Sequence, residues 1–202
     1  ITLTDSMIQA PKIFRRAADI KLERVEMPNA QETLWNCNDI TLEQVNAVGD
    51  YFAMNSENIR IEHFTLSGNY AFDGAKNIEI SHAKLLSKDA FWNCENVVVR
   101  DSTIIGEYLG WNSKNITFID CIIETNQGMC YMENVKMENC LLINTDLAFE
   151  YSTVDVQANG RIDSVKNPIS GTITAPAIGE LILDDPEIAA ENTKYQLAEE
   201  QE

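Results

Sequence analysis

The sequence predicts an all-β chain, a single-stranded right-handed parallel β-helix of about ten coils, and three observations lead to this prediction. The first is an apolar position, here called the anchor, that recurs every 19 residues with one step of 20. The anchors are Ile1, Ile20, Ile40, Ile59, Ile78, Val97, Ile116, Val135, Val154 and Ile173. A fixed period of this size is typical of a solenoid, in which each coil buries its apolar face against its neighbours.

The second observation is the strand-like alternation that follows each anchor. Another apolar residue stands two positions later, as in Leu22, Ile61 and Val99, and a further pair stands five and seven positions later, as in Phe64 and Leu66. A period of two is typical of strands and not of helices. Two short strands are therefore expected in the first half of each coil.

The third observation is an apolar and aromatic segment that closes each coil, for example YFAMN at 51–55, AFWN at 90–93 and YLGWN at 108–112. A third short strand is expected here, so that three strands and three bends make one coil. A leucine-rich horseshoe would need a different leucine spacing and a longer convex segment, and the sequence fits it poorly.

Two polar columns precede the anchors and are expected to support the stack. The residues directly before the anchors are Asp39, Asn58, Asn77, Asn96, Asn115 and Asn134. Asn tolerates turn conformations and can pass amide hydrogen bonds from coil to coil. One position earlier the charges alternate, in Glu57, Lys76, Glu95, Lys114 and Glu133. Opposite charges are thus expected on neighbouring coils, about 4.8 Å apart.

The repeat weakens after Thr153, which suggests three regions. Residues 1–153 are expected to form β-helix coils, and residues 154–185, interrupted by Gly160, Pro168 and Gly171, to form terminal coils and a cap. Residues 186–202 read as a short acidic tail helix or a disordered tail. The first coil begins on a full repeat, so its open edge offers a surface for a homodimer.

Composition excludes several partners and cofactors. The 202 residues carry 32 acidic and 15 basic side chains, a net charge of −17, which argues against binding nucleic acid or anionic membranes. Five cysteines form an odd set without CxxC spacing, so neither a zinc site nor a disulfide framework is indicated, and no cofactor is expected. A reducing compartment follows from this cysteine usage, and cytoplasmic location is the expectation.

Several segments resemble a family of uncharacterised bacterial proteins, the domain-of-unknown-function family numbered 3737. These segments are DAFWNCEN, GEYLGWNSKNITFIDC, TDLAFE, DSVKNPISGTIT and GELILDD, within residues 89–185. The resemblance implies a β-helix of the pectate-lyase type with additional N-terminal coils. It implies no catalytic residues, because none are established for the family.

One candidate site lies four residues after the anchors. This column contains Arg24, Gln44, His63, His82, Asp101, Asp120 and Asn139. Both histidines of the chain and two aspartates, His63, His82, Asp101 and Asp120, thus fall on four successive coils. Such a group could hold a divalent metal of unknown identity or offer a general base beside a carboxylate. The favoured interpretation is a polar ladder at a bend.

A second candidate site lies eleven residues after the anchors. It contains Tyr51, Tyr70, Asp89, Tyr108, Gln127 and Asp146, with Phe72, Phe91, Trp92 and Trp111 close by. The tyrosines and carboxylates Tyr51, Tyr70, Asp89, Tyr108 and Asp146 are the predicted ligand-binding residues. Sugars stack on aromatic faces, and their hydroxyls donate to carboxylates. The alternative is an aromatic stack that closes the core at a wide corner.

The function predicted from these features is a non-catalytic module that binds a glycan or a small polar ligand. A polysaccharide lyase or glycoside hydrolase is one alternative, although no column shows a compact group of carboxylates with a basic partner. A structural or protein-interaction scaffold is the other alternative, favoured by the uniform Asn and Glu/Lys columns.

Overall fold

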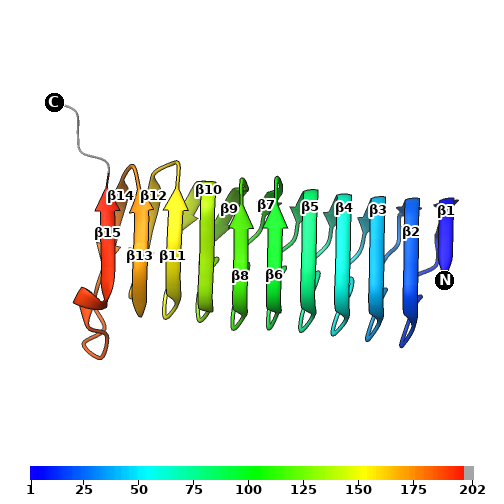
Figure 1. Cartoon of the computed structure of the whole chain (residues 1–202), viewed down its shortest axis with the longest axis horizontal. Helices are drawn as coiled ribbons and strands as arrows, with labels where there is room; N and C mark the ends of the chain where they lie inside the picture. Colours follow the sequence, from blue (N-terminus) through cyan, green and yellow to red (C-terminus); the bar gives the residue numbers. More distant parts are fainter. Residues whose placement is uncertain (198–202) are drawn as a thin grey trace.

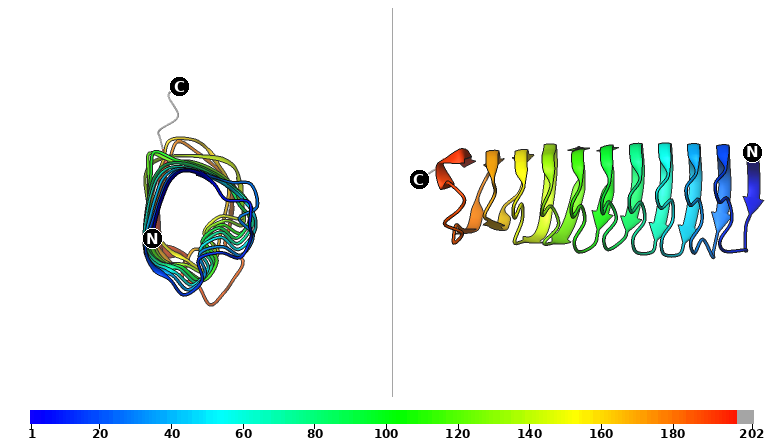
Figure 2. Two further views of the ribbon diagram at one scale, coloured as in Figure 1. Left: turned by 90° about the vertical axis from the view of Figure 1, so that its right-hand side faces the viewer. Right: turned by 90° about the horizontal axis from the view of Figure 1, so that it is seen from below.

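Parallel strands stack side by side along residues 1–197, the part of the chain that the computed structural model describes (Figure 1). Seen down the long axis, successive coils superpose (Figure 2), which confirms the right-handed parallel β-helix. The strands of the main sheet are β1 (Thr2–Met7), β2 (Ala18–Met27), β3 (Asn38–Val48), β4 (Glu57–Ser67), β5 (Lys76–Leu86), β6 (Glu95–Arg100), β7 (Thr103–Ile105), β8 (Lys114–Ile119), β9 (Ile122–Asn126), β10 (Glu133–Asp146), β11 (Thr153–Ala158), β13 (Ser170–Ala175) and β15 (Thr193–Leu197). A second sheet pairs β12 (Ile162–Lys166) with β14 (Ile178–Ile182).

The strand register confirms the 19-residue repeat. Ile59 lies between Ile40 and Ile78, and each anchor of the central coils is buried. The alternating charges also align as predicted, with ion pairs of 3.2 Å between Lys76 and Glu95 and 2.9 Å between Lys114 and Glu133. Because these pairs are exposed to solvent, each contributes little to stability.

The core is a column of apolar side chains inside the coils. Phe72 and Phe91 are fully buried, with ring centroids 5.6 Å apart, and Phe91 also contacts Phe118. Cys121, Cys140 and Ser102 are buried at equivalent positions of three successive coils. Burial of six phenylalanine side chains contributes to the hydrophobic stabilisation of the coils.

Up to Tyr151, the coils turn at residues whose backbone is left-handed. The φ angle is 54° at Asn77, 51° at His82, 53° at Asp89 and 56° at Asn93, and the same positions have positive φ in neighbouring coils. Left-handed backbone is costly for most L-residues and least costly for Gly, Asn and Asp. The frequent Asn residues at two of these corners therefore follow from the backbone geometry.

The prediction of a third strand is wrong. Residues 51–55 form turns instead of a strand, with φ angles of 54° at Tyr51 and 53° at Asn55. The segment nevertheless stacks regularly, since the backbone N–H groups of Tyr51 and Asn55 each donate to the next coil over 2.8 Å.

The asparagines before the anchors form the predicted amide ladder. Each side-chain amide donates to the side-chain oxygen of the preceding coil. The distances are 3.0 Å from Asn58 to Asp39, 3.2 Å from Asn77 to Asn58, 3.1 Å from Asn96 to Asn77, 3.0 Å from Asn115 to Asn96 and 2.8 Å from Asn134 to Asn115.

The C-terminal coils depart from the predicted spacing. Ile173 pairs with Val156, whereas Gly171 pairs with the anchor Val154, so Ile173 is not an anchor and this coil is two residues shorter. Gly171 has a φ of 128°, and a Cβ there would lie 1.7 Å from the Val154 carbonyl oxygen. A glycine is therefore required for this close approach. Residues 154–185, expected to form terminal coils and a cap, hold β11 to β14.

The predicted acidic tail helix is also wrong. A 3₁₀ turn covers Ala190–Asn192, and β15 then pairs in parallel with β13. A helix this short is marginal in water, whereas the edge of β13 offers unpaired backbone groups to a further strand. The end of the predicted tail, 198–202, lies outside the described residues.

We expect Asn77→Gly and Asn77→Ala to differ in stability. Glycine keeps the left-handed backbone and loses only the amide bonds to Asn58 and Asn96, at a cost of up to about 1 kcal/mol. Alanine should cost about 1–2 kcal/mol more, because it also opposes the positive φ. Urea unfolding measures the free energy of unfolding of both variants, with the exposed Lys76→Ala as a control. Equal losses for glycine and alanine would contradict the backbone explanation.

We also expect the native protein to resist thiol alkylation. All five cysteines are free and buried, and burial raises the pKa of the Cys94 thiol and raises that of Cys130 to about 12. These two residues then supply few thiolates at about pH 8, and burial shields all five sulfur atoms from the reagent. Mass spectrometry after iodoacetamide treatment should show labelling in denaturant and none in the folded state. Rapid labelling of the folded chain would contradict this expectation.

Candidate functional site

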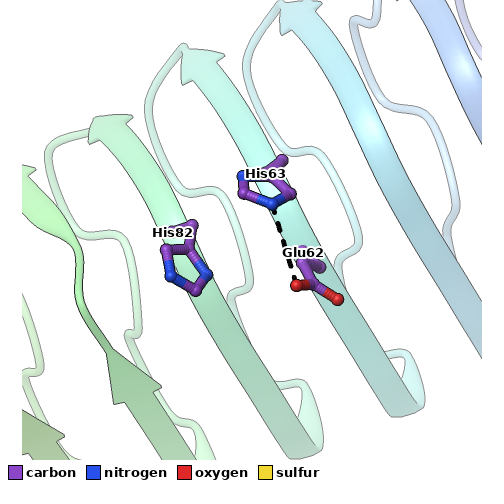
Figure 3. Close-up of side chains that lie close together, drawn as sticks. All are labelled: Glu62, His63 and His82. Carbon is purple, nitrogen blue, oxygen red and sulfur yellow. Dashed lines mark ion pairs between the residues drawn. The ribbon is translucent and has the colours of Figure 1, made fainter.

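The first candidate column brings both histidines together at one corner. His63 on β4 and His82 on β5 occupy equivalent left-handed positions, so their rings lie one above the other with centroids 4.9 Å apart (Figure 3). Glu62 approaches them, with its carboxylate 3.7 Å from Nε2 of His63. One ligand atom from each of these three residues lies within 4.8 Å of the others. We call Glu62, His63 and His82 the histidine corner.

The two aspartates of this column differ in their surroundings. Asp101 lines the same hollow of about 430 Å³ as His63 and His82. Asp120 instead accepts a hydrogen bond from the Asn139 amide, and Asn139 accepts one from Asn159. Asp120 thus belongs to a polar ladder, as the favoured interpretation of the sequence predicted for this column.

Glu62 was missed by the sequence reasoning. It stands three residues after its anchor, and its partners on neighbouring strands are Glu43 and Ser81. The signal was an acidic residue directly before a histidine at a corner, where the left-handed turn places two successive side chains on the outer surface.

The second candidate column lies in a row of aromatic side chains on the outer surface. We call this row the aromatic strip, and it consists of Trp35, Tyr51, Tyr70, Trp92, Tyr108, Trp111, Tyr131 and Tyr151. Tyr51 and Tyr70 are stacked nearly parallel at 4.9 Å, and Tyr70 contacts Trp92 at 5.9 Å. Because Tyr51 and Trp92 stack on Tyr70, mainly the edge and the hydroxyl of Tyr70 are left for a ligand.

The strip is interrupted at Asp89. The residue is 5% exposed and lies in the column between Tyr70 and Tyr108. Burial raises the pKa of Asp89 above its usual value, and the charge of Asp89 in turn raises the pKa of the Tyr70 hydroxyl. Lys88 lies 4.9 Å from the centre of the Tyr108 ring and 3.3 Å from the Glu107 carboxylate. The interruption is therefore a polar site flanked by aromatic rings.

Asp146 lies outside this column, so its predicted position is wrong. It pairs with Asn126, one residue before Gln127, because the register between β9 and β10 shifts between Ile143 and Asp146. Asp146 is exposed and bonds to the Ser164 hydroxyl.

The aromatic residues near the column separate into two groups. Phe72 and Phe91 belong to the core, whereas Trp92 and Trp111 are half-buried members of the strip. The sequence reasoning missed Trp35, and it missed Tyr131 and Tyr151, which occupy the corner where other coils carry Asn.

A third feature is a hollow of about 920 Å³ beside the asparagine ladder. One wall is the ladder itself, and the other includes Thr41, Arg60, Glu79 and Thr117. The sequence assigned the ladder a structural role only, since a repeated residue gives no sign of the surface that it borders. Among residues 1–197, no helix has the length and apolar character needed to cross a membrane.

We expect Asp89→Asn to gain stability over the natural protein as the pH rises. The folded chain holds the Asp89 proton more tightly than the unfolded chain does. The favourable contribution of this group is therefore complete below its unfolded pKa of 3.8 and is lost as the pH rises through the raised folded pKa. Asparagine at position 89 cannot ionise, so the variant does not lose this contribution to stability as the pH rises.

Urea unfolding at several values from about pH 3 to about pH 7 tests this expectation. The exposed Asp101→Asn serves as a control for the loss of one negative charge. The expectation fails if the natural protein becomes the more stable of the two as the pH rises.

Comparisons with known proteins add a family. No curated protein matches the chain. A solved structure, the catalytic domain of a GH87 alpha-1,3-glucanase in complex with nigerose, is similar over 89% of this chain and 48% of its own length, with 9% sequence identity and a TM-score of 0.30. The chain thus spans about half the length of that domain. A family model matches residues 1–196, and the chain accordingly belongs to the family described as "Protein of unknown function (DUF3737)".

Proposed function

We propose that this protein is a non-catalytic module that binds a glycan or a small polar ligand on the aromatic strip, around Tyr70, Asp89 and Tyr108. The observation that carries the proposal is the interruption of the strip by a nearly buried carboxyl between two tyrosines. Few precisely placed polar groups among aromatic side chains are typical of small-ligand sites.

The strip is not needed to close the core. The fully buried phenylalanines, among them Phe72 and Phe91, already fill the interior beneath it, while the tyrosines and tryptophans remain partly exposed to solvent. Rows of exposed aromatic side chains are uncommon on protein surfaces and mark sites of interaction. Tyrosine suits such a site because its ring is apolar and its hydroxyl both donates and accepts hydrogen bonds.

The polar groups at the interruption complement a polyhydroxylated ligand. Two coil spacings, about 10 Å, separate Tyr70 from Tyr108, and the Asp89 carboxyl lies between them. Lys88 and Glu107 add a donor and an acceptor beside Tyr108. Sugar hydroxyls donate to carboxylates and accept from ammonium and phenol groups.

The stacking of the rings indicates how a ligand would bind. Tyr51 and Trp92 cover the two faces of Tyr70, so a sugar would meet the hydroxyl edge of this ring instead of stacking on its face. The hydroxyls should therefore matter more than the ring area. The coils repeat the strip along the solenoid axis, an arrangement that suits a linear glycan laid parallel to that axis.

Asp89 also favours a second candidate function, glycoside hydrolysis. Its pKa is raised by burial and by the charges of Asp73 and Glu107, as expected for a carboxyl that acts as a general acid. Turnover of oligosaccharides that Asp89→Asn abolishes while binding persists would favour this enzyme over the binding module.

We expect Tyr70→Phe and Tyr108→Phe each to weaken binding of the preferred oligosaccharide by about 2- to 10-fold. Each variant keeps the ring in the strip and removes one hydrogen-bonding hydroxyl, which is worth about 0.5–1.5 kcal/mol. Isothermal titration with a panel of neutral and acidic oligosaccharides measures the change.

Tyr195→Phe is the matched control, because Tyr195 lies on β15 outside the strip. Retention of the oligosaccharide by Tyr70→Ala and Tyr108→Ala at the strength of the natural protein would contradict the proposal. The absence of binding to every member of the panel would favour the interaction scaffold instead.

A further inference from the structure

We propose that the histidine corner binds a divalent transition-metal ion of the zinc, copper or nickel class. The site is formed by Glu62, His63 and His82, one ligand atom of each lying within 4.8 Å of the others (Figure 3). This inference is independent of the proposed function, since the corner lies four residues after the anchors and the tyrosine column eleven.

The backbone preorganises the two imidazoles. His63 and His82 have φ angles of 52° and 51°, so both side chains leave the corner in the same direction, one coil apart. Their rings are 27° from parallel at a centroid distance of 4.9 Å. Two nitrogens on one zinc ion lie no more than about 4.2 Å apart, because each Zn–N bond is about 2.0–2.1 Å. Small side-chain rotations therefore bring the donors within reach of one ion.

The ligands are free to make those rotations. The side chains of His63 and Glu62 are 53% and 54% exposed, and His82 is exposed as well. The separation of 3.7 Å between Glu62 and His63 exceeds hydrogen-bonding distance, so a metal does not have to displace a strong bond.

The donor set selects the class of metal. Two imidazoles and one carboxylate suit zinc, copper and nickel, whereas calcium and magnesium prefer oxygen ligands alone. Asp101 follows His82 in the same column and lines the same hollow of about 430 Å³. It is not one of the three residues whose ligand atoms lie within 4.8 Å of one another, so water is left to fill the remaining position of a tetrahedral set.

The corner itself does not require histidine. Equivalent positions on other coils carry Arg24, Gln44, Asp120 and Asn139, all with positive φ. Only two histidines occur in the whole chain, and they occupy adjacent coils beside a glutamate. Backbone geometry therefore explains the polar character of the column but not this particular set of ligands.

Metal titration of the metal-free protein tests the proposal. Isothermal titration with Zn²⁺ should show one ion bound per chain, and the Cu²⁺ electron paramagnetic resonance spectrum should show splitting from imidazole nitrogen. His63→Ala and His82→Ala should each weaken Zn²⁺ binding at least about tenfold, the loss that even outer-shell changes at metal sites cause. Glu62→Gln should weaken it less.

Two further variants sharpen the test. Glu43→Gln changes the carboxylate aligned with Glu62 one coil earlier, beside Gln44 instead of a histidine, and should leave the affinity unchanged. Gln44→His adds a third imidazole next to His63 and should tighten binding. Zn²⁺ should also raise the melting temperature of the natural protein, but not that of the double variant His63→Ala/His82→Ala.

Three results would overturn the proposal. One is Zn²⁺ affinity that persists in the double variant, which would place the ion elsewhere, such as on the cysteines. Another is a Cu²⁺ spectrum without nitrogen splitting. The last is the absence of any binding heat and melting shift for Zn²⁺, Cu²⁺ and Ni²⁺ in the natural protein, whose exposed ligands need no unfolding to be reached.

Discussion

The structure depends on one constraint, the left-handed backbone that recurs at equivalent positions of successive coils up to Tyr151. At these positions the chain turns sharply, with φ angles close to 54° at Asn77 and 53° at Asp89. Since neighbouring coils turn at the same places, their backbone groups meet in register and their side chains form columns. The asparagine ladder, the core and both candidate sites all follow from this repetition.

The same constraint determines what a site on this surface can be. A single coil presents only one or two side chains on a given corner, so a group of unlike residues must come from successive coils about 4.8 Å apart. That spacing suits ring stacking, as between Tyr51 and Tyr70, and it suits ligands that share one ion, as His63 and His82 could. The aromatic strip and the histidine corner thus both depend on the spacing between successive coils, on different faces of the β-helix.

Most of the fold could be predicted from the sequence, because the apolar anchors and the Asn and Glu/Lys columns report the same period independently. The wrong predictions concern segments whose backbone geometry cannot be inferred from the local pattern of apolar and polar residues. The closing segment YFAMN has the composition of a strand, yet residues 51–55 form turns. Ile173 matched the period by chance, since Gly171 shortens its coil. At the candidate sites, the 19-residue period predicted which residues share a column. It did not predict the register shift that places Asp146 outside its column. Nor did it predict that Glu62 lies close to His63 and His82, because this depends on the directions of the side chains.

The nearest-neighbour stacking of the coils has a consequence for how such a surface can change over evolutionary time. Because each coil contacts only the coils beside it, duplicating or deleting a whole 19-residue unit keeps every remaining interface intact. Duplication of one 19-residue unit within the aromatic strip would lengthen the strip by one coil. Deletion of one unit between His63 and His82 would remove one of the two imidazoles, and the remaining coils would still stack on one another. Recognition surfaces on this scaffold can thus be varied in discrete steps, by copy number as well as by point mutation.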